Sequence, residues 1–273
     1  MNDEFLNNLY TKQQKKQQVP SNKVIAKWAF CVICILFPEL AKCIYASGEE
    51  IKEELVKLQK ELKRILDKTK ACSECDHEEV SNEFFKRLPE LYRLLNTDIV
   101  AIHRGDPAAK NEFEVIRAYP GFYALCFYRI AHTLHQLDVP LLPRILTEYA
   151  HSKTGIDIHP AAVIGEYFMI DHGTGIVIGE TSVIGKNVKM YQGVTLGGMS
   201  INKSMAQQKR HPSIEDNVVI YSNATILGGD TLVGEGSVIG GNVWLTQSVP
   251  PGSLVMQTPQ ITIVENKYIN QKV

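Results

Sequence analysis

The chain has 273 residues, which is enough for one large domain or two modest ones with a sizeable core. Its 29 basic and 30 acidic residues almost cancel, so no surplus of charge indicates a nucleic acid or an anionic membrane surface as a partner. We therefore expect this protein to act on a small molecule or to bind another protein.

The first part of the chain has little to bury. Residues 1–23 are rich in Lys, Gln and Asn, so we expect them to be disordered or frayed, and they carry no signal or transit peptide. The most apolar stretch, Trp28–Phe37, is shorter than the roughly 20 residues that cross a bilayer, and it predicts a buried helix. We expect a cytoplasmic protein without a membrane segment.

Residues 24–153 have helical periodicity and predict an α-helical domain. The stretch "EEIKEELVKLQKELKRIL", residues 49–66, repeats an aliphatic residue every three or four positions and carries charges on the opposite side. The stretch "PGFYALCFYRIAH", residues 120–132, begins with Pro and Gly and has a broad apolar face. Both stretches are typical of helices that share a core.

Four of the six cysteines form two Cys-x-x-Cys pairs, Cys31 with Cys34 and Cys72 with Cys75. Such pairs can hold zinc. The first pair lies in an apolar run, where cysteine behaves as a small hydrophobic residue. The second lacks the turn residues that flank a zinc knuckle. We therefore expect no metal site and no disulfide, and the role of residues 1–80 stays open.

From about residue 154 to residue 258 the pattern changes to a repeat of six residues. The spacing slips by two after Ile170 and by one after Ile226, and an inserted loop at 199–210 interrupts it. The repeating aliphatic residues are Ile158, Ile164, Ile170, Ile178, Ile184, Met190, Leu196, Ile214, Ile220, Ile226, Val233, Ile239 and Leu245.

A period of six fits neither a helix nor an ordinary amphipathic strand. It is the spacing of a triangular prism, in which each face is a short strand with one aliphatic side chain pointing inward and three faces complete a coil of eighteen residues. The sequence therefore predicts an α+β protein, with an N-terminal α-helical domain followed by a parallel β-helix of hexapeptide repeats. Residues 259–273 form a separate C-terminal segment.

The first slip falls on "MIDHGTG", residues 169–175, where charged residues break an otherwise regular repeat. His172 is the best candidate for a general base, because an alcohol nucleophile needs one near pH 7 and imidazole has a suitable pKa. Asp171 and His172 are adjacent on an extended segment, so we expect their side chains to point in opposite directions. The carboxylate that orients His172 is expected to be Asp157, fifteen residues earlier on the neighbouring rung.

Several further motifs narrow this interpretation. They are "DIVAIHRGDPAA", "YPGFYALCFYRIAH", "DIHPAAVIG", "IDHGTGIVIGET", "VTLGG", "KRHP" and "SVPPGS". Together they closely resemble the serine O-acetyltransferases, a family of hexapeptide-repeat acyltransferases, over about residues 85–255. The resemblance implies a left-handed β-helix and the transfer of acetyl from acetyl-CoA to the hydroxyl of L-serine. The product would be O-acetylserine, in cysteine biosynthesis, formed by direct attack with His172 as base.

The resemblance also implies a substrate site. Carboxylates at Asp106 and Asp171 suit the ammonium of serine, and the guanidinium of Arg210 suits its carboxylate. His211 is a neighbouring candidate for binding the substrate. In the resembled enzymes these positions contact serine, and also L-cysteine as a feedback inhibitor. In those enzymes the residues that match Asp157 and His172 form a catalytic dyad.

For acetyl-CoA as co-substrate, the resemblance implies a groove between adjacent β-helices. The matching positions are Gly197, Gly198, Ser222 and Gly241. This groove requires a homotrimer, and many members pair two trimers through their helical domains. Members that bind cysteine synthase end in a flexible tail with a terminal Ile, whereas this chain ends in Val273, so we doubt that partner.

Three other functions stay open. A hexapeptide acetyltransferase for a sugar or another hydroxyl acceptor shares the fold. A trimeric zinc carbonic anhydrase does too, although only His172 and His211 are suitably placed here. The third is a scaffold without catalysis. At the residue level, Asp106 before Pro107 can also be read as a helix cap, and His159 before Pro160 as structural.

Overall fold

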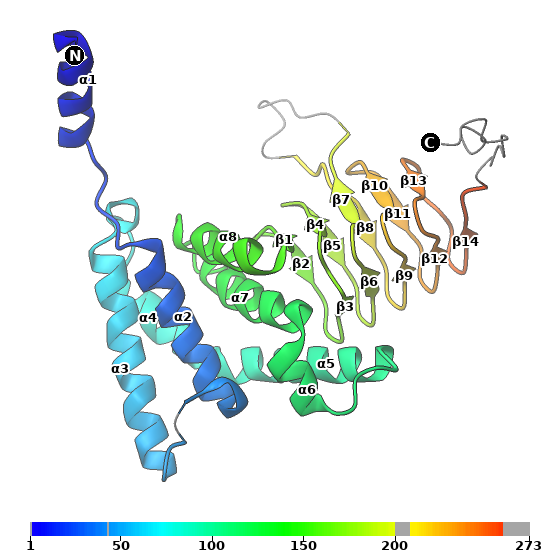
Figure 1. Cartoon of the computed structure of the whole chain (residues 1–273), viewed down its shortest axis with the longest axis horizontal. Coiled ribbons are helices and arrows are strands. Elements are labelled where there is room, and N and C mark those ends of the chain that lie inside the picture. The colour runs from blue at the N-terminus through cyan, green and yellow to red at the C-terminus, as the bar shows by residue number, and fades with distance from the viewer. Residues whose placement is uncertain (1, 43, 200–207, 259–273) are drawn as a thin grey trace, which may run out of the picture.

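The computed structural model describes residues 2–42, 44–199 and 208–258. Most of the inserted loop and the C-terminal segment 259–273 lie outside this part of the chain. A group of helices and a β-helix follow one another along the long axis of the molecule (Figure 1). No helix within the described residues is long and apolar enough to cross a membrane.

The N-terminal segment differs from the expectation of a frayed chain. Helix α1 spans Asp3–Gln14, and the Asn2 side chain caps it by accepting a hydrogen bond from the Glu4 amide. Acidic residues in its first turn and Lys12 in its last turn suit the helix dipole. None of its residues is buried, and α1 stands away from the other helices (Figure 1). Local capping therefore accounts for this helix, and burial does not.

The remaining helices pack around one core. They are α2 (Asn22–Leu36), η1 (Pro38–Leu40), α3 (Gly48–Asp67), η2 (Lys70–Cys72), α4 (His77–Lys86), α5 (Leu88–Gly105), α6 (Glu112–Ala118), α7 (Pro120–His135) and α8 (Leu142–Thr154). Trp28 and Phe84 meet in this core with ring centroids 5.4 Å apart. The predicted aliphatic stripe of α3 is buried over its second half, from Leu58 to Leu66.

The strands build three parallel sheets that share one interior. They are β1 (Asp157–Ile158), β2 (Val163–Ile164), β3 (Met169–Asp171), β4 (Val177–Ile178), β5 (Val183–Ile184), β6 (Lys189–Tyr191), β7 (Thr195–Gly197), β8 (Ser213–Ile214), β9 (Val219–Ile220), β10 (Thr225–Leu227), β11 (Leu232–Val233), β12 (Val238–Ile239), β13 (Trp244–Leu245) and β14 (Leu254–Val255). We name the sheets face A (β1-β4-β7-β10-β13), face B (β2-β5-β8-β11) and face C (β3-β6-β9-β12-β14).

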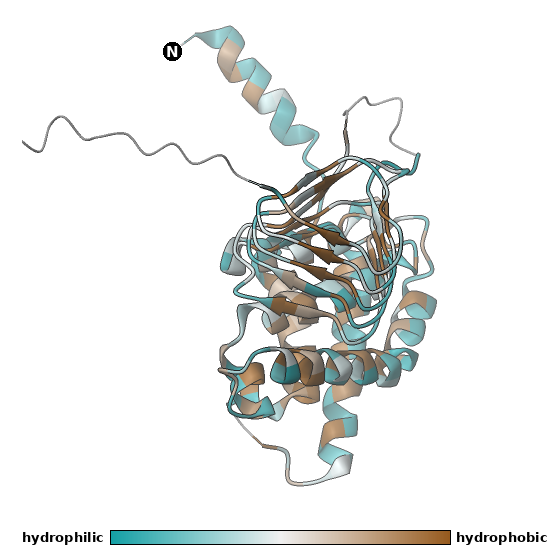
Figure 2. Ribbon diagram, turned by 90° about the vertical axis from the view of Figure 1, so that its right-hand side faces the viewer, coloured by the Kyte–Doolittle hydropathy of each residue, from teal (hydrophilic) through white to brown (hydrophobic). Residues whose placement is uncertain are grey.

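A view along the β-helix shows apolar strands surrounding its interior (Figure 2). Nearly all of the predicted inward aliphatic residues are buried, with Leu245 near the far end partly so. The predicted fold, a helical domain followed by a parallel β-helix, is therefore confirmed, because one aliphatic residue per strand fills the core.

The slip of two residues after Ile170 corresponds to a longer corner in the β-helix. Ile158 pairs with Ile178, twenty residues later, whereas Ile178 pairs with Leu196, eighteen residues later. The two additional residues lie in the corner between β3 and β4, since five residues separate these strands and only three separate β6 from β7. His172 lies in this longer corner, which bulges from the regular coil.

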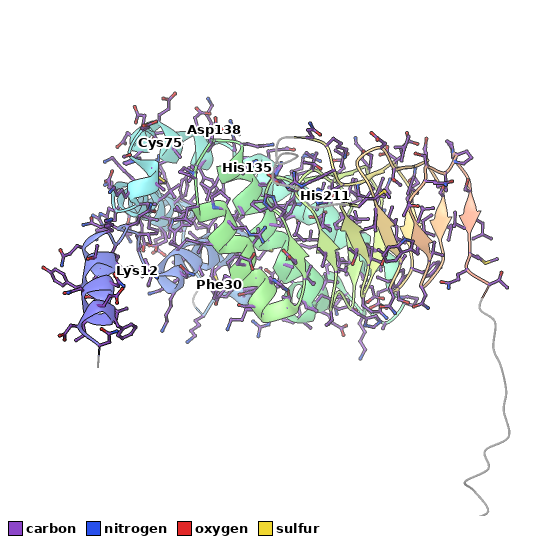
Figure 3. The ribbon with its side chains drawn as sticks, turned by 90° about the horizontal axis from the view of Figure 1, so that it is seen from above. Lys12, Phe30, Cys75, His135, Asp138 and His211 are labelled. Atoms are coloured by element: carbon purple, nitrogen blue, oxygen red, sulfur yellow. The ribbon has the colours of Figure 1, made fainter. Side chains whose placement is uncertain are left out.

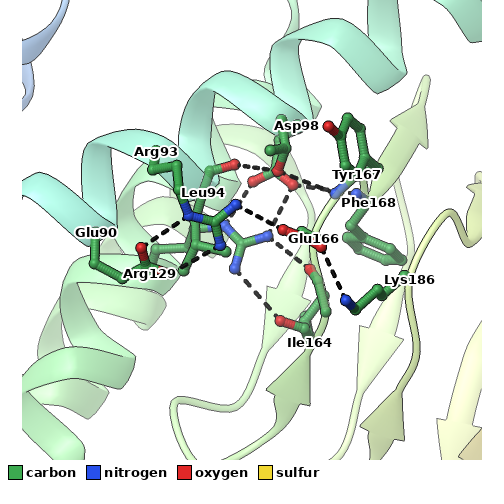
Figure 4. Close-up of polar contacts among 12 residues, drawn as sticks. Glu90, Arg93, Leu94, Asp98, Arg129, Ile164, Glu166, Tyr167, Phe168 and Lys186 are labelled. Atoms are coloured by element: carbon green, nitrogen blue, oxygen red, sulfur yellow. Dashed lines mark hydrogen bonds and ion pairs between the residues drawn. The ribbon is translucent and has the colours of Figure 1, made fainter.

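A buried ion pair holds the helices against the β-helix (Figure 4). Arg129 of α7 binds Asp98 of α5 through two nitrogens, at 2.6 and 2.8 Å. The same guanidinium donates to the Gly165 carbonyl at 2.9 Å, and Asp98 accepts from the Phe168 amide at 3.1 Å. Because both elements of the junction contribute, the position of α5 is fixed relative to β3.

Candidate active site

The long corner after β3 exposes His172. Its φ of 55° is left-handed, and its side chain is 71% exposed, whereas that of Asp171 is 14% exposed. The Asp171 carboxylate accepts from the His172 amide at 2.8 Å and lies 3.7 Å from His172 Nε2. The expectation that these side chains point in opposite directions is wrong, because the extended strand ends at Asp171.

Asp106 lies at the end of α5, close to this corner. Its carboxylate accepts one hydrogen bond from the Ala108 amide at 2.8 Å and one from the Tyr119 hydroxyl at 2.5 Å. Tyr119, Ala108 and the charge of His172 lower the pKa of Asp106, so the carboxylate stays ionised. Asp106 therefore holds the turn after α5 and is also an available anion, whereas the cap of the next helix, α6, is Asn111. Sequence reasoning missed Tyr119, although it directly precedes the helix-starting pair Pro120–Gly121.

Aromatic side chains extend this group along the β-helix. Tyr191 is the register partner of Asp171 on face C, and its ring stacks on Tyr221 with centroids 5.2 Å apart. Burial, followed by the charges of Tyr221, Asp171 and Asp106, raises the pKa of Tyr191. Asp106 and Asp171, together with Tyr191 and Tyr221, thus form an acidic, partly aromatic surface beside His172. We call Asp106, Asp171 and His172 the Asp106–His172 group.

Asp157 lies on face A, where it pairs with Val177. Within the described residues it forms no hydrogen bond or ion pair with His172. Asp171 is the carboxylate that the structure brings within 4 Å of the imidazole. The orienting role of Asp157 therefore stays a prediction.

Arg210 and His211, which we call the Arg210–His211 group, lie at the edge of face A opposite to that of His172. Arg210 pairs with Glu180, and its amide donates to the Thr181 hydroxyl at 2.9 Å. His211 lies toward the helical end of the β-helix (Figure 3). Its Nδ1 accepts from the Thr181 amide at 3.0 Å, so a neutral imidazole carries its proton on Nε2.

Close packing fixes the ring of His211. A Cβ on Gly179 would lie 2.0 Å from His211 Cδ2, so only glycine leaves space for the imidazole. Burial, aided by the charge of Arg210, lowers the pKa of His211 to about 4. Near pH 7 this histidine is neutral and offers an Nε2–H donor. His159, on the coil below, has its pKa lowered to about 4 by burial and accepts from the Ala161 amide.

The residues predicted to contact acetyl-CoA divide between the same two edges. Gly197 is the last residue of β7 and Gly198 follows it, and the Gly197 carbonyl accepts from the Gly228 amide at 3.0 Å. Ser222 and Gly241 stack at the His172 edge, where a Cβ on Gly241 would lie 3.3 Å from the Ser222 carbonyl. The segment from Gly175 to Glu180, which contains β4, separates the edges by five residue steps, or about 16 Å at about 3.3 Å per step.

Metal ligands do not gather anywhere in the described part of the chain. No group of three His, Cys, Asp or Glu side chains is suited to hold an ion there. His172 and His211 lie at opposite edges of face A, and no disulfide joins any of the five described cysteines, among them Cys72 and Cys75.

No family model matches the sequence. A curated relative does: the plasmid-encoded serine acetyltransferase of Synechococcus elongatus is 50% identical over 223 residues, which cover 80% of this chain and 69% of the relative. The chain belongs to the serine acetyltransferases. Its predicted membership of this acyltransferase family is thereby confirmed.

Solved serine acetyltransferases share the fold. Isoform 3 from Entamoeba histolytica, solved in complex with cysteine, superposes with a TM-score of 0.77 at 32% identity and covers 90% of this chain and 87% of its own. A serine acetyltransferase solved in complex with CoA superposes with a TM-score of 0.58 at 29% identity, over 84% of this chain and 95% of its own.

Proposed function

We propose that this chain transfers the acetyl group of acetyl-CoA to the hydroxyl of L-serine and releases O-acetylserine and CoA. The observation that carries the proposal is the two-residue insertion at His172, which presents an exposed imidazole beside the carboxylates of Asp106 and Asp171. A base next to two anions suits an acceptor that has both a hydroxyl and an ammonium.

The two charged ends of serine bind to different groups of residues. Asp106 and Asp171 hold the ammonium of serine. Arg210 and the Nε2–H of His211 hold its carboxylate, since a guanidinium and a neutral imidazole are both donors. Glu180 pairs with Arg210 and keeps the guanidinium in place.

His172 then takes the proton of the serine hydroxyl as the oxygen attacks the thioester carbonyl. Backbone N–H groups near Gly197 and Gly198 stabilise the oxyanion. When the tetrahedral intermediate collapses, the carbon–sulfur bond breaks and the imidazolium returns its proton to the CoA thiolate. Asp157 orients the imidazole in this scheme, as the matching residue does in the resembled family. Ser222 and Gly241 line the path of the pantetheine.

The test is release of CoA thiol from acetyl-CoA with L-serine. We expect serine-dependent release from the wild type, and a loss of roughly 10²- to 10⁴-fold in kcat in His172→Ala, because general-base catalysis contributes about that much. Absence of serine-dependent release from the wild type would refute the proposal. Equal rates in His172→Ala would instead favour a different base or a scaffold.

The active site is proposed to form between neighbouring chains of a homotrimer. Serine spans only a few ångströms, whereas the Asp106–His172 group and the Arg210–His211 group lie about 16 Å apart along one face. A threefold arrangement brings one edge of face A toward the other edge of the next copy. Whether two trimers associate through the helices is left to measurement of the mass in solution.

Mixed oligomers test this arrangement. His172→Ala and the double variant Arg210→Ala/His211→Ala should each be inactive alone. When the two are refolded or co-expressed in equal amounts, about one quarter of the sites should combine two intact halves by random mixing. Activity near that fraction is expected. If the mixture stays as inactive as its components, both halves must come from one chain.

The remaining partners follow from the same site. L-Cysteine, with the same ammonium and carboxylate, is proposed to inhibit by competing with serine. The expectation that cysteine synthase is not a partner stays a prediction, and the terminal residues on which it rests lie outside the described part. The cytoplasmic location and the absence of a metal cofactor also stay predictions.

Turnover of sugar acceptors is the outcome that would favour the alternative acetyltransferase. Asp106 argues against it, because a sugar offers no ammonium to this carboxylate. Stoichiometric zinc in the purified protein would favour the carbonic anhydrase alternative.

A further inference from the structure

A pocket lies next to Asp106, between the end of α5 and the outer surface of face C. Its volume is about 220 Å³. Val100, Ala101 and Met169 supply apolar lining, and Arg104 and Lys189 supply two cations. No acidic residue lines it.

These two cations are not neutralised by the protein. Among the described residues, neither Arg104 nor Lys189 forms an ion pair or a side-chain hydrogen bond. The acidic residues of the same junction are already paired. Glu166 binds Arg93 at 2.7 Å and Lys186 at 3.0 Å (Figure 4). The pocket therefore carries an uncompensated positive charge.

We propose that this pocket binds a small oxyanion, a phosphate or carboxylate group held between Arg104 and Lys189. A guanidinium binds such groups through two parallel hydrogen bonds, and an ammonium adds a point charge. The volume is below the roughly 300 Å³ at which pockets for drug-sized ligands begin, so the ligand is small. The apolar lining accommodates a short hydrocarbon part.

The pocket shares its walls with the acceptor site. Gly105 lines it and directly precedes Asp106, and Met169 lines it from the strand that ends at Asp171. These two walls touch closely, since a Cβ on Gly105 would lie 2.0 Å from the Met169 sulfur. A bound anion therefore contacts both elements that carry the ammonium-binding carboxylates, and it should change KM for serine. Only this last effect rests on the proposed function.

The direct test measures binding without catalysis. Thermal unfolding of the full chain is followed with sodium phosphate or propyl phosphate, against sodium chloride at equal ionic strength. We expect a saturable rise in Tm, with propyl phosphate saturating at several-fold lower concentration if the ligand is an organic anion. The double variant Arg104→Gln/Lys189→Gln should lose the rise. The matched control Lys27→Gln/Lys60→Gln removes two exposed charges elsewhere and should keep it.

An equal rise in Arg104→Gln/Lys189→Gln would overturn the proposal, because it would assign the anion to another site, such as the one for CoA phosphates. A rise that does not saturate would overturn it as well. If binding holds but KM for serine is unchanged, the pocket is an anion site without the proposed coupling. Failure of serine turnover itself would leave the melting result intact.

Discussion

Asp106 is the site residue whose state depends most on a neighbour. The Tyr119 hydroxyl contributes the largest part of the lowering of its pKa. The tyrosine in turn has its pKa raised, by burial and by this hydrogen bond, so it remains a donor throughout the physiological range. Tyr119 is therefore a positioning residue, because its hydroxyl fixes the carboxylate of Asp106.

Tyr119→Phe should raise KM for serine about tenfold or more, because a hydrogen bond to a charged group contributes about 1.5–3 kcal/mol. The effect on kcat should be smaller. With the donor removed, the pKa of the Asp106 carboxyl rises toward its ordinary value of 3.8, which an NMR titration of this carboxyl measures. Steady-state kinetics at pH 7, where Asp106 is ionised in both forms, measure KM and kcat. An unchanged KM and an unchanged pKa would show that the hydroxyl has no role in binding.

At the scale of elements, the corner between faces A and B depends on a glycine. Gly179 follows β4 and leaves the space in which the ring of His211 lies. The backbone there is not left-handed, so steric contact alone makes glycine necessary. The position of the His211 ring and the packing of the second coil thus depend on the same residue.

Gly179→Ala should displace His211 and cost about 1–3 kcal/mol of unfolding free energy, as overpacking in a tight site does. KM for serine should rise at the same time. Urea denaturation and initial rates measure the two effects. Gly48→Ala is the matched control, because a Cβ there meets nothing within 4 Å. Equal behaviour of both variants would contradict the close contact.

For the whole molecule, the junction of helices and β-helix depends on the pair Asp98–Arg129. Asp98 is fully buried and Arg129 is 5% exposed. Breaking a buried pair leaves an uncompensated charge, which is strongly destabilising. Because α5 carries Asp98 and ends just before Asp106, this junction also positions the carboxylate of Asp106.

Asp98→Asn should lower the unfolding free energy by about 3–5 kcal/mol, the usual cost of removing one partner of a buried ion pair. Urea titration measures it. Lys52→Gln removes one partner of an exposed pair with Glu49 and should change stability by less than about 1 kcal/mol. A similar small change in both variants would mean that water relieves the charge of Arg129.

The fold was predictable because the six-residue spacing of aliphatic residues permits few other structures. The slip after Ile170 also located the bulged corner. Side-chain geometry was not predictable: nothing in the sequence pattern reveals that the extended strand ends at Asp171 and that His172 is left-handed, so that the two side chains do not alternate. The contact between Tyr119 and Asp106 joins the end of α5 to the start of α7, with α6 between them in the chain, and no periodicity records it.

The inserted loop between β7 and β8 has a consequence for how the β-helix can change in evolution. Val183 pairs with Ser213, thirty residues later, whereas Thr225 pairs with Trp244, nineteen residues later. The entropy of closing a coil grows only with the logarithm of its length, so this lengthening costs about 0.4 kcal/mol. Insertions at this corner are thus nearly neutral for folding, and the length of the loop beside Arg210 is free to follow the demands of the ligand.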